Sequence, residues 1–285
     1  MLVPREDKKR PAPWCRLSPE GLDHFYQKYN RREFVHPDPL EFLYDYPDLK
    51  DREIAGLIAS SLAYGRVDQI LAKTASVLKE MGPPSKFIEN ANKRQLERLF
   101  GGFKHRFTTG RELIFLFGNI RSILGKWGTL GEFFLSGCGE DDENILPALS
   151  RFVAALWPPR AGLQSNFLPS PEKGSACKRL NLYLRWMVRK DDVDPGGWDR
   201  LPPANISSKL ASRLIVPLDT HLHRLSLELG FTSRRQADMR TALEITRAFA
   251  EIRPADPVRY DFTLTRPGIK NDPALMDFLL KCLKI

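Results

Sequence analysis

The sequence has little cysteine, and its cysteines do not form a metal or redox motif. Only four occur among 285 residues, and no two of them have CxxC spacing. Scattered cysteines of this kind predict neither a disulfide framework nor, by themselves, a zinc or iron–sulfur site. We therefore expect no metal and no cofactor. The cysteines are Cys15, Cys138, Cys177 and Cys282.

Long apolar runs are also missing from the sequence. None approaches the roughly 20 residues that a membrane-spanning helix needs, so no membrane association is expected. The first residues, MLVPREDKKRPAPW, are charged and rich in proline and lack the apolar stretch of a signal peptide. These features predict a cytoplasmic protein with a disordered basic tail over residues 1–15 and a folded part over residues 16–285.

No segment alternates between apolar and polar residues for long enough to predict a sheet. Helical spacing is present instead: Ile54, Leu57 and Ile58 lie on one face of a region from 51 to 81 that Tyr64-Gly65-Arg66 interrupts. The sequence therefore predicts an all-α protein. Further helices are expected at 85–90, 93–100, 110–127, 130–134, 145–157, 180–188, 220–229, 239–252, 260–265 and 273–284.

Acidic residues are outnumbered by basic ones. The chain has 44 Lys and Arg against 35 Asp and Glu, which gives a formal net charge of +9. Such a surplus suits a polyanionic partner, because neutralising phosphates releases counterions. A soluble basic protein without any nucleic-acid partner would have the same charge, so the balance leaves both interpretations open.

Two segments carry residues suited to chemistry. The first, GSACKRLN over 174–181, is a turn that leads into an amphipathic helix at Lys178, and the second, VPLDTHLHR over 216–224, places Asp219 as the N-cap of another helix. A lysine amine is a nucleophile only when neutral, and the positive end of a helix dipole disfavours the ammonium form. The same dipole favours an ionised Asp219. Taken alone, the first residue could be a solvated lysine and the second an ordinary cap.

The two segments resemble the helix-hairpin-helix/GPD superfamily of DNA glycosylases, in its endonuclease III-like branch. That family has L-P-G-V-G-x-K before a helix and V-D-T-H-x-x-R further on. Lys178 matches its catalytic lysine, Gly174 its first hairpin glycine, and Asp219-Thr220-His221 with Arg224 its second motif. The resemblance covers about residues 50–270. It is nearest to the archaeal 8-oxoguanine glycosylases, and the chain also resembles a bacterial family of unknown function.

This sequence departs from the glycosylase pattern in several places. Ala176 replaces the second hairpin glycine, and the hairpin itself is longer. Lys178 and Asp219 stand 41 positions apart (219 − 178), which reflects an insertion over 191–214. The cysteines that bind the family's iron–sulfur cluster are absent. These departures bear on the substrate more than on the fold.

The resemblance implies a two-lobed helical fold with a helix-hairpin-helix motif and a cleft between the lobes. One lobe would span approximately 55–215, and the other would combine the N-terminal helices with 216–285. The implied activity is base excision from double-stranded DNA followed by cleavage at the abasic site. Lys178 would form a Schiff base with the sugar, and Asp219 would assist. By this resemblance the excised base is a damaged one, an oxidised purine, and it is flipped out of the duplex first. We expect a monomer associated with the nucleoid.

Other residues are candidates for binding DNA or the flipped base. For the hairpin and its surroundings they are Lys173, Gly174, Ser175, Arg179 and Arg66; a plain turn between helices explains the hairpin equally well. For the base pocket they are Trp198, Trp186 and His221. Core packing is the more ordinary role of Trp186 on its helix, whereas Trp198 follows Gly196-Gly197 in a loop and is freer to bind. Tyr64 or Arg66 stands where the family has a DNA-inserting residue, and a simple helix junction is the alternative.

Two rival functions remain open at this point. A protein on the same scaffold could bind DNA without catalysis. Alternatively, Asp219, His221 and His223 could form a metal-dependent hydrolase site. Positions i and i+2 do not share a helix face, which counts against the two histidines binding one metal.

Overall fold

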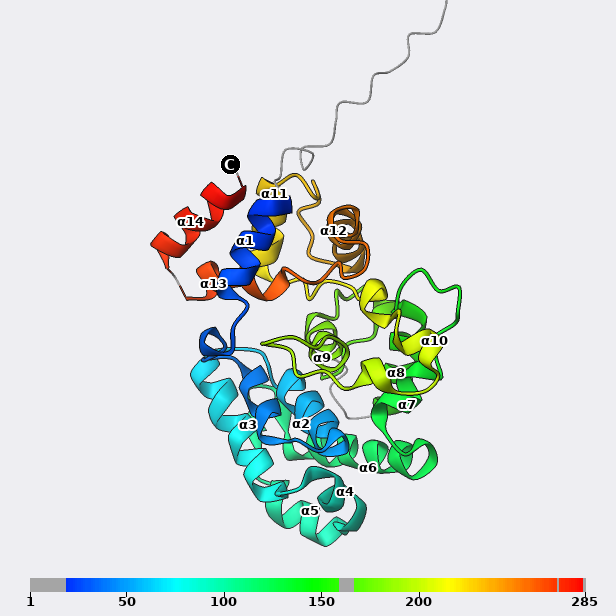
Figure 1. Cartoon of the computed structure of the whole chain (residues 1–285). Coiled ribbons are helices and arrows are strands. Elements are labelled where there is room, and N and C mark those ends of the chain that lie inside the picture. The colour runs from blue at the N-terminus through cyan, green and yellow to red at the C-terminus, as the bar shows by residue number, and fades with distance from the viewer. Residues whose placement is uncertain (1–18, 159–166, 271, 284–285) are drawn as a thin grey trace, which may run out of the picture.

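A computed structural model describes residues 19–158, 167–270 and 272–283. In this part the chain is all-α, as the sequence predicted, with helices connected by short loops (Figure 1). None of the helices in these ranges is both long enough and apolar enough to cross a membrane. The predicted basic tail over residues 1–15 lies outside the described residues.

Side-chain caps mark the start of some helices, among them α2 at Asp48 and α11 at Asp219. In the first half of the chain the elements are α1 (Pro19–Tyr29), η2 (Arg32–Phe34), η3 (Pro39–Asp45), α2 (Leu49–Ser61), α3 (Val67–Met81), α4 (Pro84–Asn90), α5 (Lys93–Phe100), α6 (Gly110–Trp127), α7 (Leu130–Leu135) and α8 (Leu146–Leu156). In the second half they are η4 (Pro171–Lys173), α9 (Lys178–Val188), η5 (Trp198–Arg200), α10 (Ala204–Ser207), η6 (Leu210–Arg213), α11 (Thr220–Glu228), α12 (Met239–Ile252), α13 (Asp261–Ile269) and α14 (Pro273–Leu283).

One group of helices is built around α2, which is largely buried. Residues 53–61 of α2 are all buried, because helices α3, α4, α7 and α9 and the 3-10 helix η3 pack against it. Gly56 makes the closest of these contacts possible: a Cβ at this position would lie 3.1 Å from a Leu43 methyl and 3.4 Å from the Tyr183 ring. Helices α5 and α6 extend this group at the lower end of Figure 1, and α8 packs against α6 and α7.

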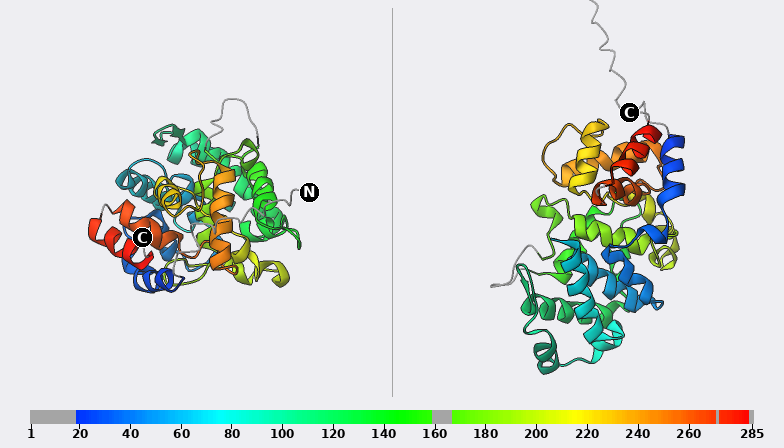
Figure 2. Two further views of the ribbon diagram at one scale, coloured as in Figure 1. Left: turned by 90° about the horizontal axis from the view of Figure 1, so that it is seen from above. Right: turned by 90° about the vertical axis from the view of Figure 1, so that its left-hand side faces the viewer.

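The second group joins the beginning and the end of the described chain. Helix α1 packs against α13 and α14, and α13 in turn packs against α11. Figures 1 and 2 show these helices together with α12 at the opposite end of the molecule from α5. Helix α9 lies between the two groups in Figure 1 and packs against α2.

Buried ion pairs connect α9 to the second group. Arg185 on α9 donates to Asp194 at 3.2 Å and also to Asp261 at the start of α13. Arg189, one turn later, pairs with Asp194 and, at 3.0 Å, with Asp256. Both arginine side chains are 4% exposed or less. Charges that are removed from water in this way must be paired, so the network fixes how α9 is oriented against its neighbours.

A small strand pair is the main departure from the predicted secondary structure. β1 (Lys104–His105) and β2 (Thr108–Thr109) pair in antiparallel register, with Arg106 and Phe107 at the turn. Each strand has two residues, which is too short for the period-two pattern by which a strand is recognised in a sequence. We call residues 104–109 the β-hairpin.

Candidate functional site

The structure brings Lys178 and Asp219 together from two different helices. Nζ of Lys178, at the first position of α9, lies 3.9 Å from Oδ2 of Asp219. Asp219 is the N-cap of α11, and its carboxylate accepts a 2.7 Å hydrogen bond from the amide of Leu222. The lysine side chain is 40% exposed and the aspartate 10%, so a solvent-accessible amine faces a carboxylate that is held in place.

The turn before α9 has an unusual backbone conformation immediately before Lys178. Gly174 (φ +77°) and Cys177 (φ +48°) both adopt the left-handed conformation, which only glycine adopts without strain. The carbonyl oxygen of Gly174 accepts a 3.1 Å hydrogen bond from the amide of Met239, the first residue of α12. The turn that the sequence predicted as a hairpin is therefore tied by its backbone to the second group of helices.

Lys178 opens onto a cavity of about 510 Å³, which we call the lysine pocket. The walls come from four segments distant in sequence: the residues just after α2, the turn before α9 with its first residues, the residue before Asp219, and the segment before α12. The lining residues are Ala63, Tyr64, Pro169, Ser175, Ala176, Cys177, Lys178, Arg179, Leu218 and Ala237. The pocket is mostly apolar apart from Lys178, Arg179 and two hydroxyl groups, as expected for a site that receives a flat, partly apolar ligand.

Arg179 stabilises the wall of the lysine pocket. Its guanidinium donates to the carbonyl oxygen of Ser61 and lies over the ring of Tyr64, with Cζ 4.9 Å from the ring centre. Burial lowers the pKa of Arg179, and the electrostatic contribution of Tyr64 opposes this shift. Arg179, which the sequence suggested as a DNA ligand, thus already has a structural role at the end of α2.

A second carboxyl group affects the electrostatics behind Asp219. Burial raises the pKa of Asp261 to about 6; the ion pair with Arg185 opposes this shift and the negative charge of Asp219 adds to it. Asp261 is 4% exposed, and its Oδ1 has no hydrogen-bond partner. The Arg185–Asp261 pair therefore places a titratable buried group within electrostatic reach of the candidate catalytic carboxylate.

The two tryptophans proposed for base binding are core residues, and the expectation that they reach a ligand is wrong. Trp198 and Trp186 are both fully buried. Nε1 of Trp198 donates to Oε1 of Glu53 at 2.6 Å, and Glu53 also accepts the amides of Leu130 and Gly131. Flanking glycines suggested a free loop, but the 191–214 insertion instead supplies Trp198 to the core.

The histidines of the second motif face away from the lysine pocket. His221 lines a separate cavity of about 460 Å³ between α11, α13 and α14. It packs so closely on Gly268 that a Cβ there would lie 2.3 Å from its Nδ1. His223 contacts the carbonyl oxygen of Arg234 at 2.8 Å. Within the residues described, no group of three His, Cys, Asp or Glu side chains could hold a metal ion.

The remaining candidates for DNA contact are at the surface. Lys173, Gly174 and Arg66 are exposed, whereas Ser175 is half-buried and its Oγ accepts from the amide of Cys177 at 3.2 Å. Arg66 pairs with Asp68 at 2.9 Å. Their positions leave them accessible to a polyanion, but Arg66 has a competing acidic partner.

The sequence reasoning missed Phe107. This side chain is 45% exposed at the turn of the β-hairpin, and its ring stacks on that of Tyr64 with centres 4.7 Å apart and planes 9° apart. Tyr64 itself lines the lysine pocket. The local sequence, KHRFTT, gives no clear signal, because a single exposed aromatic residue is ordinary at a protein surface.

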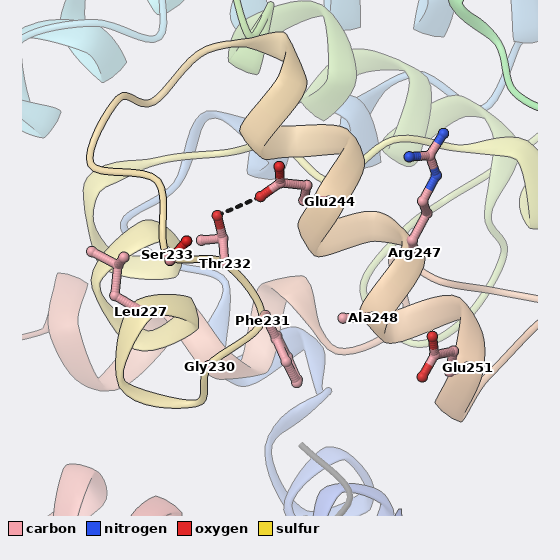
Figure 3. Close-up of a pocket in the computed structure, with 9 residues that line it drawn as sticks. All are labelled: Leu227, Gly230, Phe231, Thr232, Ser233, Glu244, Arg247, Ala248 and Glu251. Carbon is pink, nitrogen blue, oxygen red and sulfur yellow. Dashed lines mark hydrogen bonds between the residues drawn. The ribbon is translucent and has the colours of Figure 1, made fainter. Parts of the chain in front are cut away.

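Another cavity is larger but contains none of the candidate residues. It measures about 610 Å³ and lies between α11 and α12 (Figure 3). Figure 3 shows Thr232 and Glu244 across it, joined by a 2.7 Å hydrogen bond, with Arg247 and Glu251 further along α12. Thr232 and Glu244 thus satisfy each other, and Arg247 pairs at 3.5 Å with Glu143, which does not line this cavity. We therefore place the candidate site at the lysine pocket despite its smaller volume.

Fold and site together define an all-α protein with a lysine–carboxylate pair in an accessible pocket. Residues 38–270 match the model of a family described as "Protein of unknown function (DUF2400)", and the chain belongs to that family. No curated protein and no solved structure gives a significant match.

Proposed function

We propose that the protein is a DNA glycosylase with abasic-site lyase activity, in which Lys178 is the nucleophile and Asp219 its partner. The observation that supports this most directly is the 3.9 Å separation between the amine and the carboxylate at the opening of a pocket. The two groups are 41 positions apart in the chain (219 − 178), and neither is needed as a structural ion pair, since the lysine is 40% exposed.

The reaction can be written with these two groups alone. The lone pair of neutral Lys178 forms a bond to C1′ of the deoxyribose, while the glycosidic bond breaks and its electron pair leaves with the base, which takes up a proton. Asp219 stabilises the positive charge that develops on the sugar and accepts the proton that the attached amine then loses. The nitrogen lone pair then forms the C=N bond of an iminium ion as the C1′–O4′ bond breaks, and O4′ takes up the proton held by Asp219. The carboxylate, ionised again, accepts the proton lost from C2′, and this elimination expels the 3′-phosphate.

The surroundings of the pocket support a DNA substrate. The chain carries a net charge of +9, and two exposed basic residues are close in the chain to residues that line the pocket: Lys173 precedes Ser175 by two positions, and Arg66 follows Tyr64 by two. In this proposal the turn between η4 and α9 would serve as the hairpin of a helix-hairpin-helix motif, and the lysine pocket would receive the flipped base. A base reaches such a pocket only after leaving the duplex, which costs a few kcal/mol. An oxidised purine is the base we propose.

Borohydride trapping tests the proposal. The iminium ion is reduced to a stable secondary amine, so a duplex with an abasic site or a damaged base should become covalently attached to the protein. Lys178→Gln should abolish the adduct, while Lys190→Gln, which removes an exposed lysine just after the same helix, should not. If no adduct forms with abasic DNA or with any of a panel of lesions, the chain is not a lyase; intact DNA binding in that case would identify a non-catalytic DNA-binding protein.

A further inference from the structure

A second cavity, next to the lysine pocket, is lined largely by cations. It measures about 290 Å³, and we call it the hairpin pocket. Its residues come from the first turns of α3 and from the β-hairpin: Arg66, Gln69, Lys73, Lys104, His105 and Arg106. Four of the six carry a permanent positive charge, and none of the six is acidic. A concave surface of one sign concentrates the electrostatic field and attracts anions.

Two of the positive charges act on His105, a buried side chain in the lining of this pocket. The pKa of His105 is lowered mainly by burial, and the charges of Lys73 and Arg106 lower it further. Nε2 of His105 lies 3.2 Å from the carbonyl oxygen of Leu62 and 3.1 Å from that of Tyr64, so the ring donates to the end of α2. His105 thus serves as a neutral anchor, and the charge of the pocket comes from the four lysines and arginines.

The nearest acid does not neutralise the pocket. Asp68 pairs with Arg66 at 2.9 Å, but both side chains are more than half exposed, and pairs of this kind contribute little in water. Asp68 also accepts the amide of Gln69 at the start of α3. Because this carboxylate already occupies the helix N-terminus, a bound anion would be held by Lys73, Lys104 and Arg106 rather than by the helix dipole.

Tyr64 forms part of the boundary between the two pockets. Its ring lines the lysine pocket, and its hydroxyl donates to the carbonyl oxygen of His105 at 2.9 Å. Gly65, with φ +100°, lets the side chain of Arg106 lie directly against the backbone, since a Cβ there would approach that side chain to 3.1 Å. A polyanion that reaches one pocket is therefore already at the edge of the other.

We propose that the hairpin pocket binds a single phosphate of the DNA strand whose nucleotide enters the lysine pocket. This inference rests on the proposed function and adds a phosphate site distinct from the turn at Gly174. Lysine and arginine side chains from two elements can surround the oxygens of one phosphate, and such contacts fix the register of a strand without reading its sequence. The phosphate is an internal diester or a terminal phosphate at a strand break, both of which present anionic non-bridging oxygens.

The test measures equilibrium binding of the full chain to a duplex containing a tetrahydrofuran abasic analogue, which cannot form an iminium ion. For Lys73→Gln/Lys104→Gln, the dependence of log affinity on log salt should become shallower by about 1 for each lost contact. The control Lys79→Gln/Lys86→Gln removes two exposed lysines of α3 and α4 outside the pocket and should keep the wild-type slope. Equal slopes for the two double variants would overturn the proposal.

Neutral methylphosphonate linkages then locate the phosphate. One linkage at a time is placed along the strand, and a single position should weaken wild-type binding but leave Lys73→Gln/Lys104→Gln unaffected. A nicked duplex with or without a 5′-phosphate separates the terminal phosphate from the diester. If every methylphosphonate position that weakens wild-type binding also weakens binding by the variant, the hairpin pocket holds no phosphate. This result is independent of borohydride trapping, which reports only on the chemistry of Lys178.

Discussion

Nη1 of Arg185 donates a hydrogen bond to Oδ2 of Asp261, and both side chains are almost completely buried. Arg185 also contacts Asp194, so one guanidinium neutralises two buried carboxylates from different segments. Substituting Arg185→Met would leave both without this partner. We expect the free energy of unfolding to fall by about 3–5 kcal/mol, as for other buried pairs that lose one member.

Urea denaturation measures this loss. The control Arg200→Met breaks the exposed pair with Asp199 and should change stability by less than about 0.5 kcal/mol. The combination Arg185→Met/Asp261→Asn should recover part of the loss, because one orphaned charge is removed. If Arg185→Met were no more destabilising than the control, the network would not hold α9 in place.

The ionisation of buried Glu53 should make the stability of the protein depend on pH. Burial raises its pKa from 4.5 to about 7, and hydrogen bonds from Gly131, Leu130 and Trp198 oppose the shift. Since the folded state binds this proton more tightly than the unfolded state, the stabilisation is complete below pH 4.5 and is lost as the pH rises through 7. The free energy of unfolding should change by about 3 kcal/mol in all, because each pKa unit corresponds to about 1.4 kcal/mol.

Comparison with Glu53→Gln isolates this contribution. Between pH 5 and pH 8 the wild type should lose stability relative to Glu53→Gln, because only the wild type must bury a charge at the higher pH. The measured quantity is the difference between the two free energies of unfolding. Other titrating groups act equally in both proteins and cancel. A difference that stays constant over this range would mean that Glu53 is already ionised when buried.

Asp219 has two roles that substitutions can separate. Asp219→Asn keeps an oxygen that can cap α11 and should change the melting temperature little, whereas Asp219→Ala should cost about 1 kcal/mol. Both variants lose the carboxylate and should slow borohydride-trapped adduct formation by about 10²-fold or more. Wild-type trapping rates in Asp219→Asn would assign this residue to capping alone.

Phe107 predicts a change in DNA binding without a change in stability. Its exposed ring can stack on a base at the edge of an opened site, which is worth about 1–3 kcal/mol. Phe107→Ala should therefore weaken binding to abasic-analogue DNA by about 5- to 150-fold at an unchanged melting temperature. Leu227→Ala truncates a similarly exposed apolar side chain beside a different cavity and is the control. Equal affinities of the two variants would exclude stacking.

Local sequence signals were sufficient for most of the secondary structure. Asp219 and Asp238 each precede an apolar helical pattern and cap a helix as such residues do, and the helix at 239–252 has the predicted boundaries. The interruption at Tyr64-Gly65-Arg66 also separates two helices as expected. These features depend on residues close together in the chain, which is why a single sequence reveals them.

Contacts between distant segments were harder to predict. Trp198 follows two glycines and suggested a mobile loop, but its position depends on Glu53, 145 residues earlier. Phe107 was overlooked because its importance comes from Tyr64, 43 positions away (107 − 64), and not from any local pattern. The proximity of Lys178 and Asp219 was anticipated only through a resemblance, since their spacing alone does not determine a distance.

The hydrogen bond from Tyr64 to His105 has a consequence for how occupancy of one cavity is felt in the other. A molecule that displaces the ring of Tyr64 must either break this hydrogen bond or move the β-hairpin together with the ring. Binding in the two pockets is then thermodynamically linked, and the linkage is reciprocal: each ligand changes the affinity of the other by the same factor. Tyr64→Phe would keep the wall intact while uncoupling the two.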